Sequence, residues 1–172
     1  GVGELIRNAV SNGAERILLG LGGSATNDCG IGMASALGWR FLDENEKSVV
    51  PCGASLSEIT KIIPPEKDFG LPVTAACDVE NPLFGKSGAA YVFAPQKGAD
   101  EAMVSRLDSG LQSVAKVIKN CTGKDVASIS GAGAAGGMGA GAIAFLNAEL
   151  KKGIDIILDE SGFDSLARES DL

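Results

Sequence analysis

Histidine is absent from the sequence of 172 residues. Ser-His-Asp hydrolysis, Cys-His proteolysis and histidine-ligated metal sites are therefore excluded, because each of them needs an imidazole. Cysteine is sparse, and no two of the four cysteines lie closer together than 23 residues, so the sequence contains no CxxC metal or redox motif. Cysteines spaced this widely are typical of reduced thiols in a cytosol, not of a disulfide framework. We therefore expect a cytoplasmic protein.

Long apolar runs and an excess of basic residues are also missing. No apolar run reaches the roughly 18 residues that a membrane helix needs, and no basic, apolar and small-residue leader opens the sequence. Asp and Glu number 22 against 15 Lys and Arg, which gives a net charge of −7. An acidic chain without a clustered basic patch is a poor candidate for binding nucleic acid or an anionic membrane. We expect neither as a partner.

Glycine is the residue in excess, at 24 of the 172 residues, which is about twice the usual share. The glycines cluster in a few loops instead of forming a repeat, and such clusters are typical of backbone that approaches a ligand. Hydrophobic residues make up 45% of the chain, enough for a core in one domain of this length. We therefore expect a soluble intracellular enzyme or nucleotide-binding domain that occupies residues 1–172 as a single domain.

Expected strands and helices largely alternate along the chain. Short apolar runs bounded by glycine, proline or polar residues predict the strands, and apolar residues at helical spacing predict the helices. The alternation favours an α/β fold with a mixed, partly parallel sheet, flanking helices and glycine-rich loops at the strand ends. The expected strands are 17–21, 39–42, 71–77, 90–93, 125–129 and 154–158. The expected helices are 2–10, 30–37, 101–120, 143–152 and one from 165 onward.

The segment 20–28, GLGGSATND, lies between an expected strand and an expected helix. A strand that runs into glycines and then into a helix leaves several amides free at one spot, which attracts phosphate. Asp28 is a candidate ligand for Mg²⁺ or for a substrate hydroxyl. The alternative is an ordinary strand–helix turn with one N-cap residue, although capping explains only one of the four polar residues. The candidates for binding phosphate or substrate are Gly22, Gly23, Ser24, Thr26 and Asn27.

Asp78 and Asn81 belong to a second polar segment, 77–88, which follows an expected strand. Ligands in α/β proteins bind beyond the carboxyl ends of strands, where Asp78 is expected to lie. The tail Gly85-Lys86-Ser87 is similar to the end of a P-loop, but that motif needs glycine at position 80, which is Glu80. Asp78 is therefore a candidate catalytic residue and Asn81 a candidate substrate-binding residue. The alternative is a turn built by Asx and Asn-Pro chemistry.

Lys97 follows a further expected strand, in the segment PQKGAD at 95–100, just before the long expected helix. A lysine there can supply the cation that a transferring phosphoryl group needs. Gln96 beside it is a candidate for contacting substrate or phosphate. The alternative is a solvated surface residue, which is the usual state of a single loop lysine.

The glycine run 131–139, GAGAAGGMG, satisfies the GxGxxG pattern and precedes an expected helix. A glycine-rich turn before a helix is a possible phosphate cradle, although the motif alone is weak and such glycines also permit close helix packing. The candidates for binding phosphate in this run are Gly133, Gly136 and Gly137.

The same glycine run supports an alternative function, the dinucleotide-binding domain of an oxidoreductase. Asp155 and Asp159 lie 19 and 23 residues beyond Gly136, where the ribose-binding acid of a dinucleotide fold belongs. The preceding segment 126–130 argues against this alternative. It is short and half polar, whereas the first strand of such a unit is normally a continuous apolar run.

Four stretches of the sequence, taken in order, resemble one family. They are GLGGSATNDCGIGMASALG at 20–38, CDVENPLFGKSGAAYVFAPQKGA at 77–99, GAGAAGGMGAGAIAFL at 131–146 and KKGIDIILD at 151–159. Together they resemble the type-1 glycerate kinase family, and the likeness extends over essentially the whole chain. One departure is Cys29, where the family pattern has glycine. Family members are about twice as long, so the resemblance implies the central, inserted domain of a two-domain glycerate kinase, with the N-terminal segment and the C-terminal Rossmann-like portion absent.

The resemblance implies ATP-dependent phosphorylation of D-glycerate to a phosphoglycerate, with ATP and Mg²⁺ as cofactors. Phosphoryl transfer needs amide cradles, a cation, a metal-binding carboxylate and a group that orients the hydroxyl. We assign Asp28 to the metal, Asp78 to the substrate hydroxyl and Lys97 to the transferring phosphoryl group. Either hydroxyl of glycerate fits this chemistry.

The chain is expected to form only part of an active-site cleft. The glycerate carboxylate needs a basic partner, which we place outside the chain because no arginine here lies in a loop motif. We therefore expect the chain to need the remaining domain of the same polypeptide and to be inactive alone.

Overall fold

The computed structural model describes residues 1–67 and 70–170, and three of its strands form one parallel sheet. The strands are β1 (Ile17–Gly20), β4 (Val73–Ala76) and β5 (Glu149–Lys151), in the order β1-β4-β5. Ladders join β1 to β4 and β4 to β5, although the strands are far apart in the sequence. Because all three strands run the same way, their carboxyl ends meet at one edge of the sheet. The expected α/β fold with a parallel sheet is confirmed.

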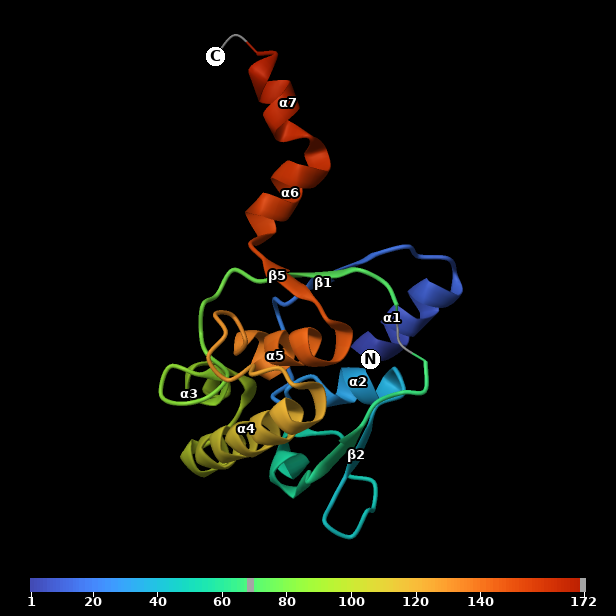
Figure 1. The fold of residues 1–172 in the computed structure, drawn as a ribbon. Coiled ribbons are helices and arrows are strands. Elements are labelled where there is room, and N and C mark those ends of the chain that lie inside the picture. Colours follow the sequence, from blue (N-terminus) through green and yellow to red (C-terminus); the bar gives the residue numbers. More distant parts are fainter. Residues whose placement is uncertain (68–69, 171–172) are drawn as a thin grey trace.

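Three helices cover one face of this sheet (Figure 1). They are α1 (Val2–Ser11), α2 (Ile31–Ala36) and α5 (Ala134–Leu146). Ile17 and Val73 point into the apolar layer between sheet and helices, where Met138 packs against them. Leu18 alternates to the opposite face of the sheet and is 51% exposed.

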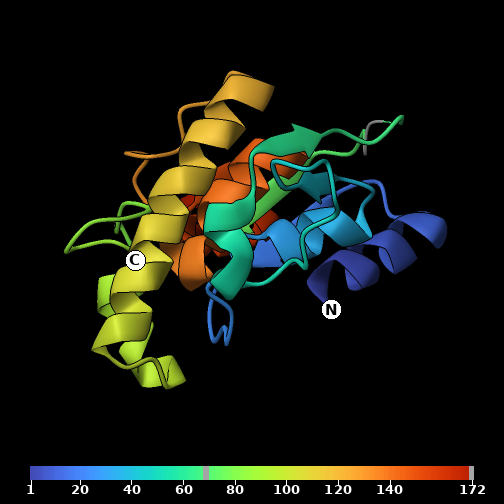
Figure 2. The same ribbon diagram turned by 90° about the horizontal axis from the view of Figure 1, so that it is seen from below.

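A second core lies between α5 and the long helix α4 (Glu101–Thr122). Figure 2 shows α4 and α1 on opposite sides of the pair α2 and α5. The Asp100 carboxylate caps α4 by accepting a hydrogen bond from Met103 N over 2.8 Å, and Gly123 ends the helix in the left-handed conformation. The 3-10 helix η1 (Gly53–Glu58) packs on α4, and the antiparallel pair β2 (Arg40–Leu42) and β3 (Lys61–Ile63) lies beside it.

The chain leaves this body through α6 (Gly153–Ser161) and α7 (Phe163–Arg168), which extend away from the sheet (Figure 1). Neither helix contains a buried residue. The Arg16 guanidinium makes a bidentate salt bridge to Glu160, which ties the exposed side of α6 to the turn before β1. Among the helices of the described chain, none is both long and apolar enough to span a membrane.

Two expected strands are helices. Residues 90–93 belong to α3 (Ala89–Phe93), and residues 154–158 belong to α6. Both runs are short and apolar, and periodicity cannot separate a strand from a buried helix turn over so few residues. At α6 the deciding contact is distant, because the Asp78 carboxylate accepts a hydrogen bond from Gly153 N.

Two further expectations are wrong in the last third of the described chain. Residues 125–129 contain no strand, and only 127 and 128 form a turn. The helix expected at 143–152 ends at Leu146, because Asn147 takes the left-handed conformation with φ 53°, and 149–151 form β5. The helix expected from residue 165 onward is α7, and its predicted end at 171–172 lies outside the described residues.

Candidate functional site

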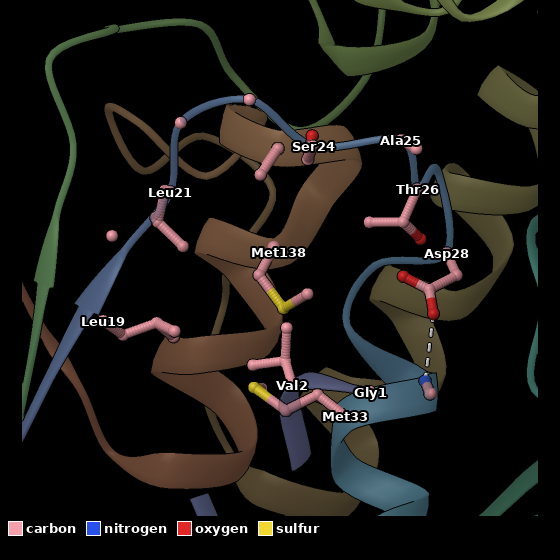
Figure 3. Close-up of a pocket in the computed structure, with 15 residues that line it drawn as sticks. Gly1, Val2, Leu19, Leu21, Ser24, Ala25, Thr26, Asp28, Met33 and Met138 are labelled. Carbon is pink, nitrogen blue, oxygen red and sulfur yellow. Dashed lines mark hydrogen bonds between the residues drawn. The ribbon is translucent and has the colours of Figure 1, made fainter. Parts of the chain in front are cut away.

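The carboxyl end of β1 opens into a pocket of about 500 Å³ (Figure 3). One side of the pocket is formed by Gly22–Asp28, which we call the 22–28 loop. The sequence predicted this loop between a strand and a helix, and the structure places it between β1 and α2. The other side is apolar and consists mainly of Leu19, Leu21, Met33, Ala135 and Met138.

The backbone amides of the 22–28 loop have no hydrogen-bond partner among the described residues. On either side of it, Leu21 N donates to the Ala76 carbonyl oxygen and Cys29 N donates to the Gly136 carbonyl oxygen, both over 3.1 Å. Between them, no described residue accepts a hydrogen bond from the N–H groups of 22–28. Gly23 has φ +63°, which bends the loop through a conformation that glycine adopts readily. Successive free amides in a bent loop can bind an anion such as phosphate or carboxylate.

The fold itself does not require glycine at Gly20 or Gly22. A Cβ atom at either position would have no neighbour within 4 Å, and neither residue has a positive φ. A glycine in a strand interior costs roughly 0.5–1 kcal/mol relative to alanine. Because neither packing nor backbone conformation explains these glycines, they favour a function in which another molecule approaches the backbone closely.

Lys97 meets the 22–28 loop from the short helix η2 (Pro95–Lys97). Its Nζ atom donates to Ser24 Oγ over 3.0 Å and to the Thr26 carbonyl oxygen over 2.6 Å. Burial lowers the pKa of Lys97 below its ordinary value, and the nearby Asp28 carboxylate raises it in part. The expected strand before Lys97 is α3, so the lysine lies on a helical turn and not at a strand end. It is held by the loop and is not a solvated surface residue.

The Asp28 carboxylate is buried and lines the pocket. Oδ1 accepts a hydrogen bond from Gly30 N and Oδ2 accepts one from Gly32 N, both over 3.0 Å, and the second bond is drawn in Figure 3. These two amides fix the orientation of the carboxylate and use two of its roughly four acceptor positions. Within residues 1–67 and 70–170 there is no cluster of three or more Asp, Glu, Cys or His side chains able to hold a metal ion by themselves.

Other predicted residues lie outside the pocket lining. Asp78 follows the carboxyl end of β4, as predicted, but its Oδ1 accepts a hydrogen bond from Gly153 N over 2.8 Å. Asn81 Nδ2 donates to the Ser87 carbonyl oxygen over 2.8 Å. Gln96 is exposed on η2. Asn27 also does not line the pocket, and its Oδ1 atom is buried without a partner among the described residues.

The glycines of the 131–139 run are packed against backbone. A Cβ atom at Gly136 would lie 2.0 Å from the Thr26 carbonyl oxygen, and one at Gly133 would lie 2.3 Å from the Pro82 carbonyl oxygen. Gly133 N donates to the Asn81 carbonyl oxygen over 2.9 Å, so this amide is already used. A Cβ at Gly137 would lie 3.0 Å from Cys29 Cα. These contacts support the explanation that the glycines of this run permit close packing. As a result, the start of α5 packs directly against the 22–28 loop.

The described part of the chain does not have the arrangement of a dinucleotide-binding domain. Turns precede the glycine run, where that fold needs an apolar strand. Asp155 lies on α6 instead of at the end of the next strand, which is where a ribose-binding acid would stand.

The sequence motifs do not indicate the apolar side of the pocket. Met33 is in the small-residue helix α2 and Met138 is in the glycine run, so both have the pattern of ordinary core residues. The sequence therefore gives only weak evidence that these methionines contact a ligand, because a methionine at helical spacing more often fills a gap in the core. Only the pairing of α2 with α5 beside the end of β1 brings them to one pocket.

Comparisons with family models and with known proteins lead to the same family. The family model described as the glycerate kinase family matches residues 1–172. The glycerate kinase of Bacillus cereus is 50% identical over the whole of this chain, which covers 46% of that relative. The glycerate 2-kinase of Escherichia coli is 50% identical over 91% of this chain and 42% of its own length.

A solved structure has the same fold. The crystal structure described as that of a glycerate kinase 2 from Salmonella typhimurium LT2 superposes with a TM-score of 0.86 and 44% sequence identity, over 92% of this chain and 43% of that one. The chain thus spans less than half the length of the relatives named here. The match over all of its residues shows that the chain belongs to the glycerate kinase family.

Proposed function

We propose that this chain forms one wall of the active-site cleft of an ATP-dependent glycerate kinase. One observation carries the proposal: the Lys97 ammonium group is bonded to Ser24 and Thr26 on a loop whose amides are free, beside the buried Asp28 carboxylate. A cation, an amide cradle and a carboxylate are the parts that phosphoryl transfer needs. Relatives named glycerate kinase are about twice as long as the chain, which supports a second wall formed by the remaining domain of the same polypeptide.

In this proposal the 22–28 loop and Lys97 hold the transferring phosphoryl group. The free amides bind its oxygens, and the lysine stabilises the negative charge that spreads over them in the transition state. An ammonium group has three N–H donors, and two of them are used by Ser24 and Thr26. The third remains for a phosphate oxygen, while the two protein bonds keep the cation in place before the substrate arrives.

Asp28 fits a magnesium ion that is carried by a nucleotide. Mg²⁺ in kinases is held by one or two carboxylates together with phosphate oxygens and waters, so no all-protein cage is required. Asp28 lines the pocket and has acceptor positions left after its two amide bonds. When bound there, the ion would neutralise charge on the phosphates.

Asp78 is the proposed acceptor of the proton from the glycerate hydroxyl. As the hydroxyl oxygen bonds to the γ-phosphorus of ATP, the bond to the leaving ADP breaks and the carboxylate takes the hydroxyl proton. Its place at the end of β4, the neighbour of β1 in the sheet, supports this role. Asp78 is also bonded to the first residue of α6, so a change at this position alters the helix as well.

The helices α6 and α7 support the proposal of a further domain. Four of their large apolar side chains are exposed by half or more of their surface, which is typical of a surface that another part of the protein covers. We place the basic residue that binds the glycerate carboxylate in that further domain. The four cysteines are all free thiols, which supports a cytoplasmic location. The exposed apolar residues are Ile154, Ile157, Phe163 and Leu166.

The proposal is tested by the product of the complete polypeptide. It is incubated with ATP, Mg²⁺ and D-glycerate, and the phosphoester is identified by phosphorus NMR. Because the Escherichia coli relative is named glycerate 2-kinase, we expect phosphate on the 2-hydroxyl. Phosphate on the 3-hydroxyl would contradict only the position of transfer, whereas the absence of any phosphoester would contradict the proposed activity.

A further inference from the structure

The apolar side of the pocket, formed mainly by Leu19, Leu21, Met33, Ala135 and Met138, is called its floor below. This floor is more apolar than a site for glycerate requires. Leu21, Met33 and Met138 are 7%, 3% and 8% exposed, so the pocket meets only the outer edge of a continuous apolar core. Figure 3 shows Leu19, Leu21 and Met138 facing the space below the 22–28 loop. Glycerate is a three-carbon acid with a carboxylate and two hydroxyls, and it has no apolar face to place on such a floor. The floor therefore fits a different molecule or a different part of one.

The size of the pocket leads to the same conclusion. Its volume of about 500 Å³ falls within the roughly 300–1,000 Å³ that is usual for pockets of drug-sized ligands. Such pockets combine mainly apolar walls with a few placed polar groups. Here the polar side chains of the lining come from the 22–28 loop, and most of the apolar side chains line the other side. A ligand with one flat apolar end and one anionic end matches this division.

We propose that the pocket is the nucleotide subsite, with the adenosine part of ATP or ADP on the apolar floor and the phosphates along the amides of the 22–28 loop. The inference rests on the proposed function, because it concerns the phosphoryl donor of that reaction. The terminal phosphate lies next to Lys97, which is bonded to the same loop. Glycerate binds beyond the terminal phosphate and outside this pocket.

The floor residues suit a purine ring. Methionine side chains are flexible and polarizable, and their sulfur atoms make favourable contacts with aromatic rings. The Sδ atom of Met138 lies only 3.3 Å from the position of a Cβ on Gly30, so the N-cap of α2 packs closely against this side chain. The glycines at 20 and 22, which the fold does not require, leave room for a nucleotide to pass close to the backbone.

The test compares two neighbouring leucines of β1. Leu19 lines the pocket, whereas Leu18 points to the opposite face of the sheet. The complete polypeptide carries Leu19→Ser or Leu18→Ser, and the probe is fluorescent N-methylanthraniloyl-ADP titrated without glycerate. Loss of an apolar contact predicts at least about fivefold weaker ADP binding for Leu19→Ser. Leu18→Ser is expected to bind ADP like the wild type, and neither variant is expected to change the KM for D-glycerate.

A second variant covers the case in which Leu19→Ser does not fold. Ala25 is exposed on the loop and lines the pocket, so Ala25→Glu adds a negative charge beside the proposed phosphates without disturbing the core. It is expected to weaken ADP binding about tenfold and adenosine binding much less, because only ADP carries phosphate. Asn45→Glu places the same charge on the exposed turn after β2, which does not line the pocket, and is expected to have no effect.

The outcomes separate this inference from the proposed function. A higher KM for glycerate with unchanged ADP binding in Leu19→Ser or Ala25→Glu would overturn the inference, because the pocket would then be the acceptor site. Unchanged values for both ligands in an active kinase would also overturn it and leave the proposed function standing. Weaker ADP binding in a protein that does not phosphorylate glycerate would support the nucleotide pocket and contradict the proposed activity.

Discussion

The ammonium nitrogen of Lys97 lies 2.6 Å from the carbonyl oxygen of Thr26, although the two residues are 71 positions apart in the sequence. This bond joins the helical turn η2 to the 22–28 loop and, with the bond to Ser24 Oγ, fixes both partners. Lys97 can therefore act in two ways, as a cation near the phosphates and as the contact that holds the loop in its ligand-binding shape. The two roles lead to different experimental results.

Replacing the lysine tests its catalytic role. Lys97→Ala is expected to lower kcat/KM of the complete enzyme by about a hundredfold, the scale of roughly 3 kcal/mol for one lost electrophilic contact. Lys86→Ala removes an exposed lysine from the 81–88 segment and is the matched control, with no change expected. If Lys97→Ala equals the wild type in steady-state kinetics, Lys97 neither acts as the catalytic cation nor is needed to hold the loop in its ligand-binding shape.

The pKa of Lys97 predicts how activity depends on pH. Burial holds this pKa below its ordinary value of about 10.5. Because the charged form is the active one and its proton is lost as the pH rises, kcat/KM should fall with increasing pH at a value below 10.5. Lys97→Arg should move this fall to higher pH or abolish it, since arginine stays protonated. The same basic limb in wild type and Lys97→Arg would show that another group titrates.

The role of Asp28 is tested by comparison with Asp43, an aspartate outside the site that also accepts hydrogen bonds from two backbone amides. Asp28→Asn is expected to lower kcat at least about a hundredfold by removing charge from the site. It should also lower the free energy of unfolding by roughly 1–3 kcal/mol, because two backbone amides lose a charged acceptor. Asp43 accepts hydrogen bonds from Asn45 N and Lys47 N on an exposed turn, so Asp43→Asn should affect stability only. Chemical denaturation and steady-state kinetics at saturating Mg²⁺ measure both effects, and normal turnover in Asp28→Asn would refute the assignment.

Substitutions at Gly136 and Gly22 distinguish a glycine that the fold requires from a glycine that ligand binding requires. Gly136→Ala is expected to lower the free energy of unfolding by at least about 2 kcal/mol, because the new Cβ would lie 2.0 Å from the Thr26 carbonyl oxygen at φ +70°. Gly22→Val meets open space, so thermal unfolding should be unchanged while ADP binding weakens. A large loss of stability in Gly22→Val would mean that the fold, not a ligand, requires this glycine.

The sequence predicts most of the framework that positions the site. The apolar run of β1, the glycine and polar residues after it and the apolar stripe of α4 are local patterns, and the structure contains all three. The runs that became α3 and α6 are too short to show a period. The start of α6 depends on Asp78, 75 residues earlier, which no local pattern records.

The composition of the site was only partly accessible from the sequence. The 22–28 loop and Lys97 were found as separate motifs, but their contact is a tertiary one. Glycines that face a ligand and glycines that permit packing look the same in a sequence. Gly22 and Gly136 differ only in what surrounds their Cα atoms, and that requires the folded chain.

Turnover is the measurement that decides whether the chain supplies one wall of a glycerate kinase cleft. A coupled ADP-release assay with ATP, Mg²⁺ and D-glycerate compares the complete polypeptide with residues 1–172 alone. The complete polypeptide is expected to turn over at roughly 1–100 s⁻¹, as kinases usually do. Residues 1–172 alone should fold and release no ADP, because the proposed second wall of the cleft belongs to the rest of the polypeptide. Turnover in that range by the chain alone, or none by the complete polypeptide, would contradict this role of the chain.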